Sequence, residues 1–451
     1  MEDSGFLRIF TRQTKQEETR DTLTPVDSTG TRAPLQDDIL SPNHAFSENE
    51  DGTRTLTLFS HFPRGRKEKG FYRGSLNIDN IPELADSAFA ASVTTLVIRG
   101  EAIAARDIKC IKKYRASNGG VLPGLTRVSL PDFAGEIPNL GHEYEPNAWL
   151  ERFEAPMAKS VGYIAFNNCT GLVSVDLSAA EIIEERAFAR CSRLTTVDLP
   201  VARIVHCRAF ERCSRLITVN LPAAKVVCLW AFKDCSSLTT VDLPVARIIQ
   251  SRAFERCSNL TTVDLPAARI IQSRAFERCS NLKTINLPVA EIIERRAFKY
   301  CSSLITVDLP AAKKIKRYAL YDCSRLITVN LPVAKSIGRR AFKYCSSLAT
   351  VDLPAAKTIE SRAFEYCPNL TTVDLPAAKK IRNEVFFCCS ALRTLKLGYA
   401  GKVRLKADIF GNKDRDMANI IDLYLDAARV PSKGRRRYGK YTWRHIQTYI
   451  P

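Results

Sequence analysis

Large apolar residues recur along the chain with a period of 22 residues, and each period contains a short stretch in which apolar and polar residues alternate. Leu194, Val197 and Leu199 mark one such stretch. In an extended strand successive side chains point to opposite faces, so Val197 and Leu199 share one face while Thr196 and Asp198 share the other. The pattern therefore predicts a short strand in every period, with its apolar face in the core and its Thr/Asp face exposed.

The periods are close copies of one another. Segments 241–262 and 263–284 differ only at Val245/Ala267 and Thr261/Lys283. The common unit contains L-x-T-V-D-L-P followed by A-F-x-x-C-S, and such self-similarity indicates duplication of a stacked structural unit. One cysteine marks each unit: Cys169, Cys191, Cys213, Cys235, Cys257, Cys279, Cys301, Cys323, Cys345, Cys367 and Cys389.

A single unit is too small to fold by itself. It offers about five large apolar side chains, worth roughly 1.5–3 kcal/mol each when buried. Ordering its backbone costs on the order of 1–2 kcal/mol per residue. Stacked units cover each other's core, with Ile249, Ala253 and Phe254 packing inward from the return limb. We expect a repeat solenoid, a leucine-rich-repeat horseshoe with a parallel β-sheet on the concave face and short helical or irregular segments on the convex side.

Departures from the regular pattern divide the chain into four parts. Residues 1–55 are polar and rich in Thr, Asp, Ser and Pro, which predicts a disordered segment. Residues 56–150 carry degenerate repeats that serve as an N-terminal cap. Residues 151–397 hold the regular 22-residue repeats, and residues 398–451 form a C-terminal cap with a basic-aromatic tail.

The repeated A-F-x-x-C-S-x-L-x-x-V-x-L-P motif resembles the BspA-like branch of leucine-rich-repeat proteins. The resemblance covers about residues 80–430, and Leu423–Leu425 with Tyr441 and Trp443 resembles the closing unit of that family. It implies a curved solenoid that binds other proteins, often as an adhesin at the cell surface. Alanine stands where the general leucine-rich repeat has Asn or Cys, as at Ala202, so the usual asparagine ladder is absent.

The exposed face of the predicted strands is a candidate site for a protein partner. A row of acidic residues with interspersed asparagines runs along it, and stacked carboxylates repel each other. Basic residues five positions later, such as Arg203 and Lys313, are candidates to offset that repulsion. Both a solvated polar face and a partner-binding face are consistent with this pattern. The candidate binding residues are Thr196, Asp198, Thr218, Asn220, Thr240, Asp242, Thr262, Asp264, Thr284, Asn286, Thr306 and Asp308.

The formal net charge of +19 adds polyanion binding, to nucleic acid or a glycosaminoglycan, as the alternative function. Arginine interleaved with aromatic residues in the tail suits phosphate contact and base stacking. The same aromatic residues also suit a cap over the last repeat. A further basic row precedes the Ala-Phe pair: Arg186, Arg208, Arg252, Arg274, Arg296, Arg340 and Arg362. The tail residues concerned are Lys433, Arg435, Arg436, Arg437, Lys440 and Arg444.

The repeat cysteines are expected to be buried and reduced. Cysteine packs as a small hydrophobic residue. Residues 1–20 have no secretory-signal pattern and no 18-residue apolar stretch occurs, which predicts a cytoplasmic location, although the family resemblance allows the cell surface. Cys207, Cys228 and Cys388 lie outside the ladder that the repeat cysteines form, and one of these is a candidate for an exposed, reactive thiol.

Nothing in the sequence resembles an active site. The five histidines are scattered without ligand spacing, and no nucleotide-binding glycine pattern or nucleophile motif occurs. We therefore expect no enzymatic activity, no cofactor and no metal. The expected partner is a protein of unknown identity, with self-association through a solenoid edge as a further option.

Overall fold

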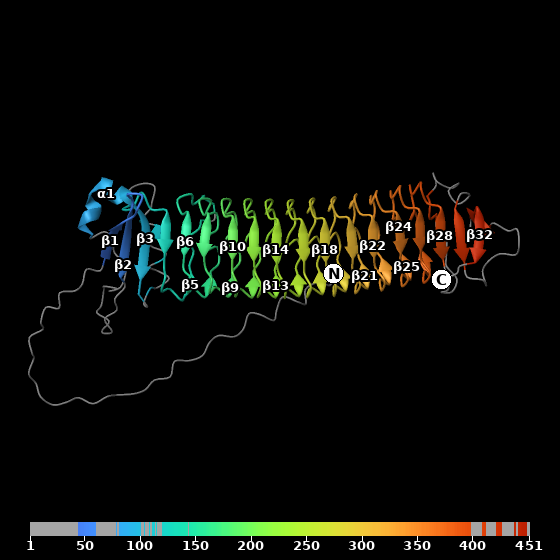
Figure 1. Cartoon of the computed structure of the whole chain (residues 1–451), viewed down its shortest axis with the longest axis horizontal. Coiled ribbons are helices and arrows are strands. Elements are labelled where there is room, and N and C mark those ends of the chain that lie inside the picture. The colour runs from blue at the N-terminus through green and yellow to red at the C-terminus, as the bar shows by residue number, and fades with distance from the viewer. Residues whose placement is uncertain are drawn as a thin grey trace, which may run out of the picture. The chain divides into compact units, whose positions relative to one another are not determined.

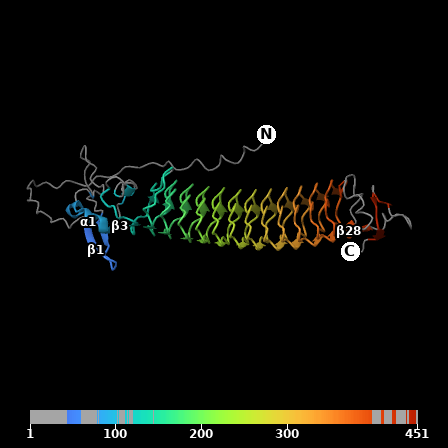
Figure 2. The same cartoon turned by 90° about the horizontal axis from the view of Figure 1, so that it is seen from above.

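The computed structural model describes most of the chain from residue 44 onward. The chain divides into two units, Met1–Ser41 and Pro42–Pro451, and all described residues lie in the second. Its regular turns stack one after another along a single axis (Figure 1, Figure 2). The described residues are 44–59, 78, 81–100, 103, 108, 111–112, 114, 120–142, 144–397, 408–411, 421–425, 437–438 and 441–448.

One limb of each turn forms the predicted parallel sheet, here called the first sheet. Neighbouring strands pair in register 22 residues apart, as Val197 does with Val219. In most strands the middle residue is buried and its neighbours are exposed, the pattern that the alternation predicts. The described strands of this sheet are β10 (Thr196–Asp198), β12 (Thr218–Asn220), β14 (Thr240–Asp242), β16 (Thr262–Asp264), β18 (Thr284–Asn286), β20 (Thr306–Asp308), β22 (Thr328–Asn330), β24 (Thr350–Asp352), β26 (Thr372–Asp374), β28 (Thr394–Leu397), β29 (Asp422–Leu425) and β32 (His445–Thr448).

The return limb, where the sequence predicts short helical or irregular segments, holds a second parallel sheet of two-residue strands joined by turns. A β-branched pair such as Ile248–Ile249 suits an extended backbone, with its second residue in the core. The described strands of this second sheet are β5 (Glu136–Ile137), β7 (Ser160–Val161), β9 (Ile182–Ile183), β11 (Ile204–Val205), β13 (Val226–Val227), β15 (Ile248–Ile249), β17 (Ile270–Ile271), β19 (Ile292–Ile293), β21 (Lys314–Ile315), β23 (Ser336–Ile337), β25 (Thr358–Ile359) and β27 (Lys380–Ile381).

Between the two sheets, identical side chains stack from turn to turn. The rings of Phe254 and Phe276 are parallel within 3°, with their centroids 5.2 Å apart, and both are buried. The thiol of Cys279 donates a hydrogen bond to the carbonyl oxygen of Phe254 in the preceding turn, at 3.2 Å. Each turn thus contributes its apolar side chains to one continuous core, which confirms the predicted leucine-rich-repeat solenoid.

Two residues in every regular turn adopt left-handed backbone angles although they are not glycine. Arg252 and Arg256, for example, have φ values of 59° and 63°. This conformation costs L-residues roughly 1–2 kcal/mol. Their N–H groups donate to carbonyl oxygens of the next turn, 3.0 Å and 2.9 Å away, and these bonds offset the strain. We call these two positions the corners of the turn, and their backbone conformation depends on hydrogen bonds to the next turn of the stack.

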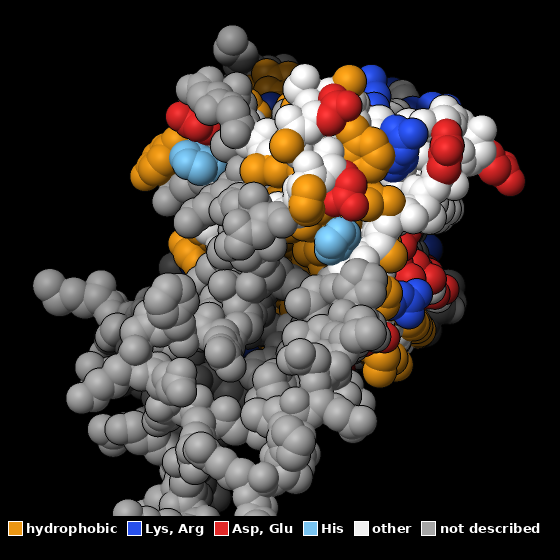
Figure 3. All heavy atoms as spheres, turned by 90° about the vertical axis from the view of Figure 1, so that its left-hand side faces the viewer, with side chains coloured by type: hydrophobic (Ala, Val, Ile, Leu, Met, Phe, Trp, Pro, Cys, Tyr) orange, Lys and Arg blue, Asp and Glu red, His pale blue; other side chains and the backbone are white. Residues whose placement is uncertain are grey.

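The N-terminal end differs from the predicted boundary. The segment predicted to be disordered, 1–55, includes strand β1 (His44–Glu48) and the first residues of β2 (Arg54–Phe59). These strands are ordered because Phe46 of β1 packs on Phe89 and because Leu56 and Leu58 of β2 reach the core. Residues 1–43 lie outside the described residues. Hydrophobic, charged and histidine side chains mix on this end (Figure 3). The other elements here are η1 (Pro82–Ala85), α1 (Ser87–Ser92), β3 (Val93–Arg99), β4 (Arg127–Ser129), β6 (Arg152–Glu154) and β8 (Ser174–Asp176).

At the C-terminal end, aromatic side chains close the core. Trp443 is fully buried and its ring packs edge-on against Phe410, with centroids 5.9 Å apart. Strands β30 (Arg437–Tyr438) and β31 (Tyr441–Thr442) pair antiparallel beside it. Within the part of the chain that the structure describes, no helix has the length and apolar character needed to cross a membrane.

Candidate partner-binding site

The twelve candidate binding residues lie together on the outward side of the first sheet, here called the Thr/Asp face. Each is exposed, since strands β10 to β20 place their first and third residues outward. The middle residue of each strand, such as Val197 or Val263, points to the core. The alternation in the sequence therefore predicts the composition of this face correctly.

Asparagine side chains relieve the repulsion along the acidic row. Asn220 donates an Nδ2–H hydrogen bond to Oδ1 of Asp198 at 2.9 Å, and Asn286 and Asn330 make the same bond to the preceding aspartate. Where two aspartates are neighbours, as at Asp242 and Asp264, no asparagine separates them. Some neighbouring strands of this face are therefore joined by an amide–carboxylate hydrogen bond, whereas others place two carboxylates side by side.

A shallow hollow of about 410 Å³ lies on this face over β10, β12 and β14. Thr196, Thr218 and Thr240 provide hydroxyl groups along it, and the Asp198, Asn220 and Asp242 side chains provide carboxylate and amide groups. Such a floor offers both donors and acceptors to an extended partner segment.

A row of exposed valines borders the Thr/Asp face and was not singled out in the sequence. Val201, Val245, Val289 and Val333 stand one residue beyond the strand-ending proline and are each about 40% exposed. They occur in every second turn, with alanine at this position in the turns between, so they stand about 10 Å apart at two strand spacings. This Val/Ala alternation with a period of 44 residues was the signal in the sequence that could have revealed them.

The basic residues that follow the strands do not offset the aspartates as expected. Arg203 instead lies 3.6 Å from Glu181, and Lys313 lies 2.7 Å from Glu291. In both pairs the glutamate occupies the same position of the preceding turn. This pairing arises because residues 22 apart stack side by side, which brings Arg203 next to its counterpart in the preceding turn. The carboxylates of the Thr/Asp face remain available to solvent or to a partner.

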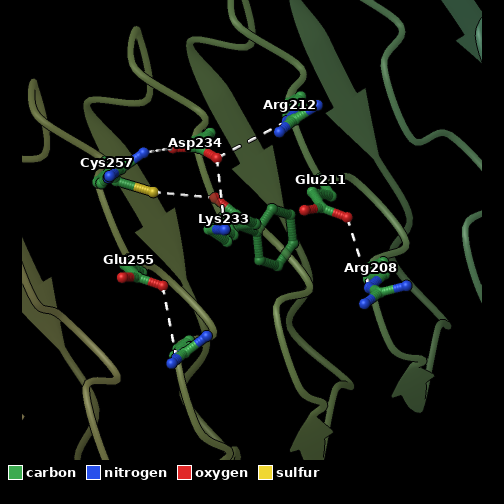
Figure 4. A network of polar contacts seen from close by, with 10 residues as sticks. Arg208, Glu211, Arg212, Lys233, Asp234, Glu255 and Cys257 are labelled. Atoms are coloured by element: carbon green, nitrogen blue, oxygen red, sulfur yellow. Dashed lines mark hydrogen bonds and ion pairs between the residues drawn. The ribbon is translucent and has the colours of Figure 1, made fainter.

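Most arginines of the row before the Ala-Phe pair are engaged in ion pairs. Arg208, for example, lies 3.6 Å from Glu211 (Figure 4). Four residues further along each turn stands a second row, in which Asp234 lies 3.9 Å from Arg212 and 3.5 Å from Arg256 and so bridges the two arginines. Arg186, Arg252, Arg274, Arg340 and Arg362 also have a glutamate partner. Pairing within the protein reduces the positive charge that this row presents to a polyanion.

Most of the basic tail lies outside the described residues, including Lys433, Arg435, Arg436 and Lys440. Arg437 is described only as part of strand β30, without its side chain. Arg444 is exposed and lies 3.6 Å from Asp422.

The repeat cysteines are reduced and buried, as expected. Burial raises the pKa of the Cys257 and Cys301 thiols far above the ordinary value, so these groups stay protonated and donate to carbonyl oxygens. Of the described residues, no group of three or more His, Cys, Asp or Glu side chains is arranged to hold a metal ion.

Cys207 differs from the repeat cysteines. It is only partly buried, and a hydrogen bond from the Cys228 thiol, helped by the Leu229 N–H, lowers the pKa of Cys207 to about 7 against the opposing effect of burial. The same contact and burial raise the pKa of Cys228. Among Cys207, Cys228 and Cys388, Cys207 is therefore the best candidate for the reactive thiol that the sequence suggested.

Comparison with known proteins agrees with this architecture. The model of a BspA type leucine rich repeat region (6 copies) matches residues 147–261, 203–327, 269–393 and 313–414. These matches together span 147–414, which is 268 of 451 residues, and the chain therefore belongs to this family. Comparison with curated proteins finds no match.

Solved structures resemble the chain at low sequence identity. A leucine-rich repeat protein from Bacteroides ovatus is 19% identical, covers 86% of this chain and 99% of its own, and has a TM-score of 0.53. A leucine rich cell surface protein from Faecalibacterium prausnitzii is 19% identical over 80% of this chain and 94% of its own, with a TM-score of 0.35. The pneumococcal vaccine antigen PcpA is 14% identical over 92% and 98%, with a TM-score of 0.35. The first likeness concerns the fold alone.

Proposed function

We propose that the protein is a binding scaffold that holds a protein partner on the Thr/Asp face. The observation that carries this proposal is the combination of a polar floor with the bordering valines, each about 40% exposed. Protein interfaces combine apolar anchors with polar groups that pair across the contact. Membership of a leucine-rich-repeat family supports a scaffold role, since such solenoids present long surfaces to partners.

The partner that fits this face is an extended segment with basic and apolar side chains. Basic groups complement the adjacent Asp242 and Asp264 carboxylates, and apolar groups cover Val245 and Val289. Complementary charge favours association and fixes register, while the apolar contacts provide most of the affinity.

Site-specific photocrosslinking tests this proposal. A benzophenone amino acid at Thr240, on the Thr/Asp face, is compared with the same residue at Thr358, which lies in β25 of the second sheet. In extract of the source cells we expect a discrete protein adduct from position 240 that disappears in an Asp242→Arg/Asp264→Arg background. Adducts from position 358 alone would place the interface on the other sheet, and adducts to nucleic acid would favour the polyanion alternative.

Adhesion is the finer form of this proposal. It rests on the family resemblance, since surface proteins occur among such solenoids. Protease treatment of intact source cells is the direct test: an adhesin is cleaved from outside, whereas an interior scaffold is degraded only after lysis.

A further inference from the structure

A second hollow lies on the outward side of the second sheet, away from the Thr/Asp face. Its volume is about 580 Å³, and five consecutive turns, those with β17, β19, β21, β23 and β25, contribute to its lining. Gly338 stands where the neighbouring turns have Lys316 and Glu360. A Cβ atom at Gly338 would lie 2.6 Å from the backbone nitrogen of Arg317, so a side chain there requires the backbone to shift. The missing side chain helps to leave this hollow open.

Three arginines stack along the hollow. Arg295, Arg317 and Arg339 occupy the same position in successive turns, two residues after the buried isoleucines that pair in register between β19, β21 and β23. All three are exposed, and neighbouring turns place them about 4.8 Å apart. Like charges in register repel each other. The other regular turns from Glu185 to Asn383 have acidic, neutral or apolar residues at this position.

The carboxylates of the hollow do not neutralise this ladder. Glu294 lies 2.5 Å from Lys316, and Glu360 lies 3.7 Å from Arg382, so both acids already have cationic partners. Lys314 adds another exposed ammonium group to the lining. Of the residues that the structure describes, none forms an ion pair with Arg295, Lys314 or Arg339. The hollow thus concentrates positive charge that the protein itself leaves uncompensated.

The phenol of Tyr318 reports the same positive environment. Burial opposes its ionisation, but hydrogen bonds from Arg317 at 3.1 Å and from Arg340 at 2.9 Å outweigh burial and lower the pKa of Tyr318 to about 8. Anionic oxygen is therefore stabilised at the edge of the arginine ladder.

We propose that this hollow, the arginine pocket, binds a small ligand that carries two or more phosphate or sulfate groups. Planar guanidinium groups match the oxygens of these anions in paired hydrogen bonds, and the Lys314 ammonium adds a point charge. The volume of about 580 Å³ leaves room for more than one oxyanion. The pocket uses neither the Thr/Asp face nor the basic tail, so it is independent of the proposed partner-binding function.

Titration calorimetry on the full chain tests this site with two probes, sodium tripolyphosphate and a fully sulfated heparin disaccharide. The pocket variant Arg295→Gln/Arg339→Gln is matched by the control Lys225→Gln/Arg247→Gln, which removes the same charge from exposed residues outside the pocket. We expect the pocket variant to bind at least about tenfold more weakly, because charge-assisted hydrogen bonds are lost, and the control to bind as the wild type does. The probe that binds more tightly shows whether the pocket prefers phosphate or sulfate groups.

Two results would overturn the proposal. One is no binding of either probe by the wild type at about 1 mM. The other is an equal loss of affinity in the pocket and control variants, which would mean that overall charge alone attracts the anion. Circular dichroism verifies that both variants are folded. Should the double variant unfold, Lys314→Gln is the second test, because it alters an outward strand position that forms no ion pair with the residues the structure describes. Wild-type affinity in the Lys314→Gln variant would likewise contradict the site.

Discussion

At the scale of single residues, cysteine has two distinct environments in this protein. In the ladder, most of the buried thiols donate to a phenylalanine carbonyl 25 residues earlier, as Cys301 does to Phe276 at 3.2 Å, and Cys345 donates to the Leu320 carbonyl in the same way. The Cys301 thiol is protonated because burial raises its pKa far above the ordinary value. Cys207 is instead partly exposed, and its thiolate is stabilised by the Cys228 thiol. Reactivity follows the thiolate, so the two environments differ in chemistry as well as in packing.

We expect Cys207 to be the first thiol labelled when the native protein is treated with iodoacetamide. The rate should rise through a midpoint near pH 7 and be low at pH 6, because the pKa of Cys207 is about 7 and only the thiolate reacts. Peptide mass spectrometry at several pH values measures this. In Cys228→Ala the donor is lost, and the midpoint should move up toward the ordinary thiol value. Earlier labelling of a ladder cysteine, or an unmoved midpoint, would contradict the assignment.

At the scale of the structural element, one turn is held by its inward side chains and very little by its outward ones. Phe276 is 1% exposed and stacks between Phe254 and Phe298, with centroid distances of 5.2 Å and 5.3 Å. Thr262 stands on the Thr/Asp face and is exposed. Each turn contacts mainly its neighbours, so damage to one turn stays local at first.

Phe276→Ala should lower the free energy of unfolding by about 3–5 kcal/mol, because the cavity interrupts the ring stack. Thr262→Ala should change it by no more than about 0.5 kcal/mol, because an exposed hydroxyl is lost. Urea unfolding followed by circular dichroism measures both, and the Phe276→Ala curve should broaden or split around the damaged turn. A larger effect of Thr262→Ala would reverse the assignment of inward and outward faces.

At the scale of the whole described unit, the solenoid needs its ends covered, since the last turn would otherwise expose the core. Trp443 meets this need at the C-terminal end, where it is fully buried against Phe410. Arg444, directly after it, is exposed and pairs with Asp422 on the surface. We therefore expect the described aromatic part of the tail to act as a cap.

Trp443→Ala should lower the melting temperature of the C-terminal turns, because removal of a buried indole costs about 3–5 kcal/mol and exposes their apolar edge. Hydrogen–deuterium exchange, measured on individual peptides by mass spectrometry, should show reduced protection in β28 and β29 and little change near β10. Arg444→Gln, which alters only a surface ion pair, is the matched control and should leave protection unchanged. Equal protection in the tryptophan variant and the wild type would contradict the cap.

The 22-residue period by itself determined the solenoid, the two faces of its strands and the burial of the cysteine ladder, because stacked units place like residues side by side. It also contained the arginine ladder, since Arg295, Arg317 and Arg339 are 22 residues apart.

Contacts at other separations were decided only by the tertiary structure. The Cys207–Cys228 contact spans 21 residues and the thiol–carbonyl bonds span 25. Both depend on how the left-handed residues at the corners turn the chain, and arginine or tyrosine at those positions has no local preference for that conformation. The neighbouring turn imposes it through hydrogen bonds, so the corners, the engagement of Glu294 and Glu360 and the opening at Gly338 exist only in the stacked array.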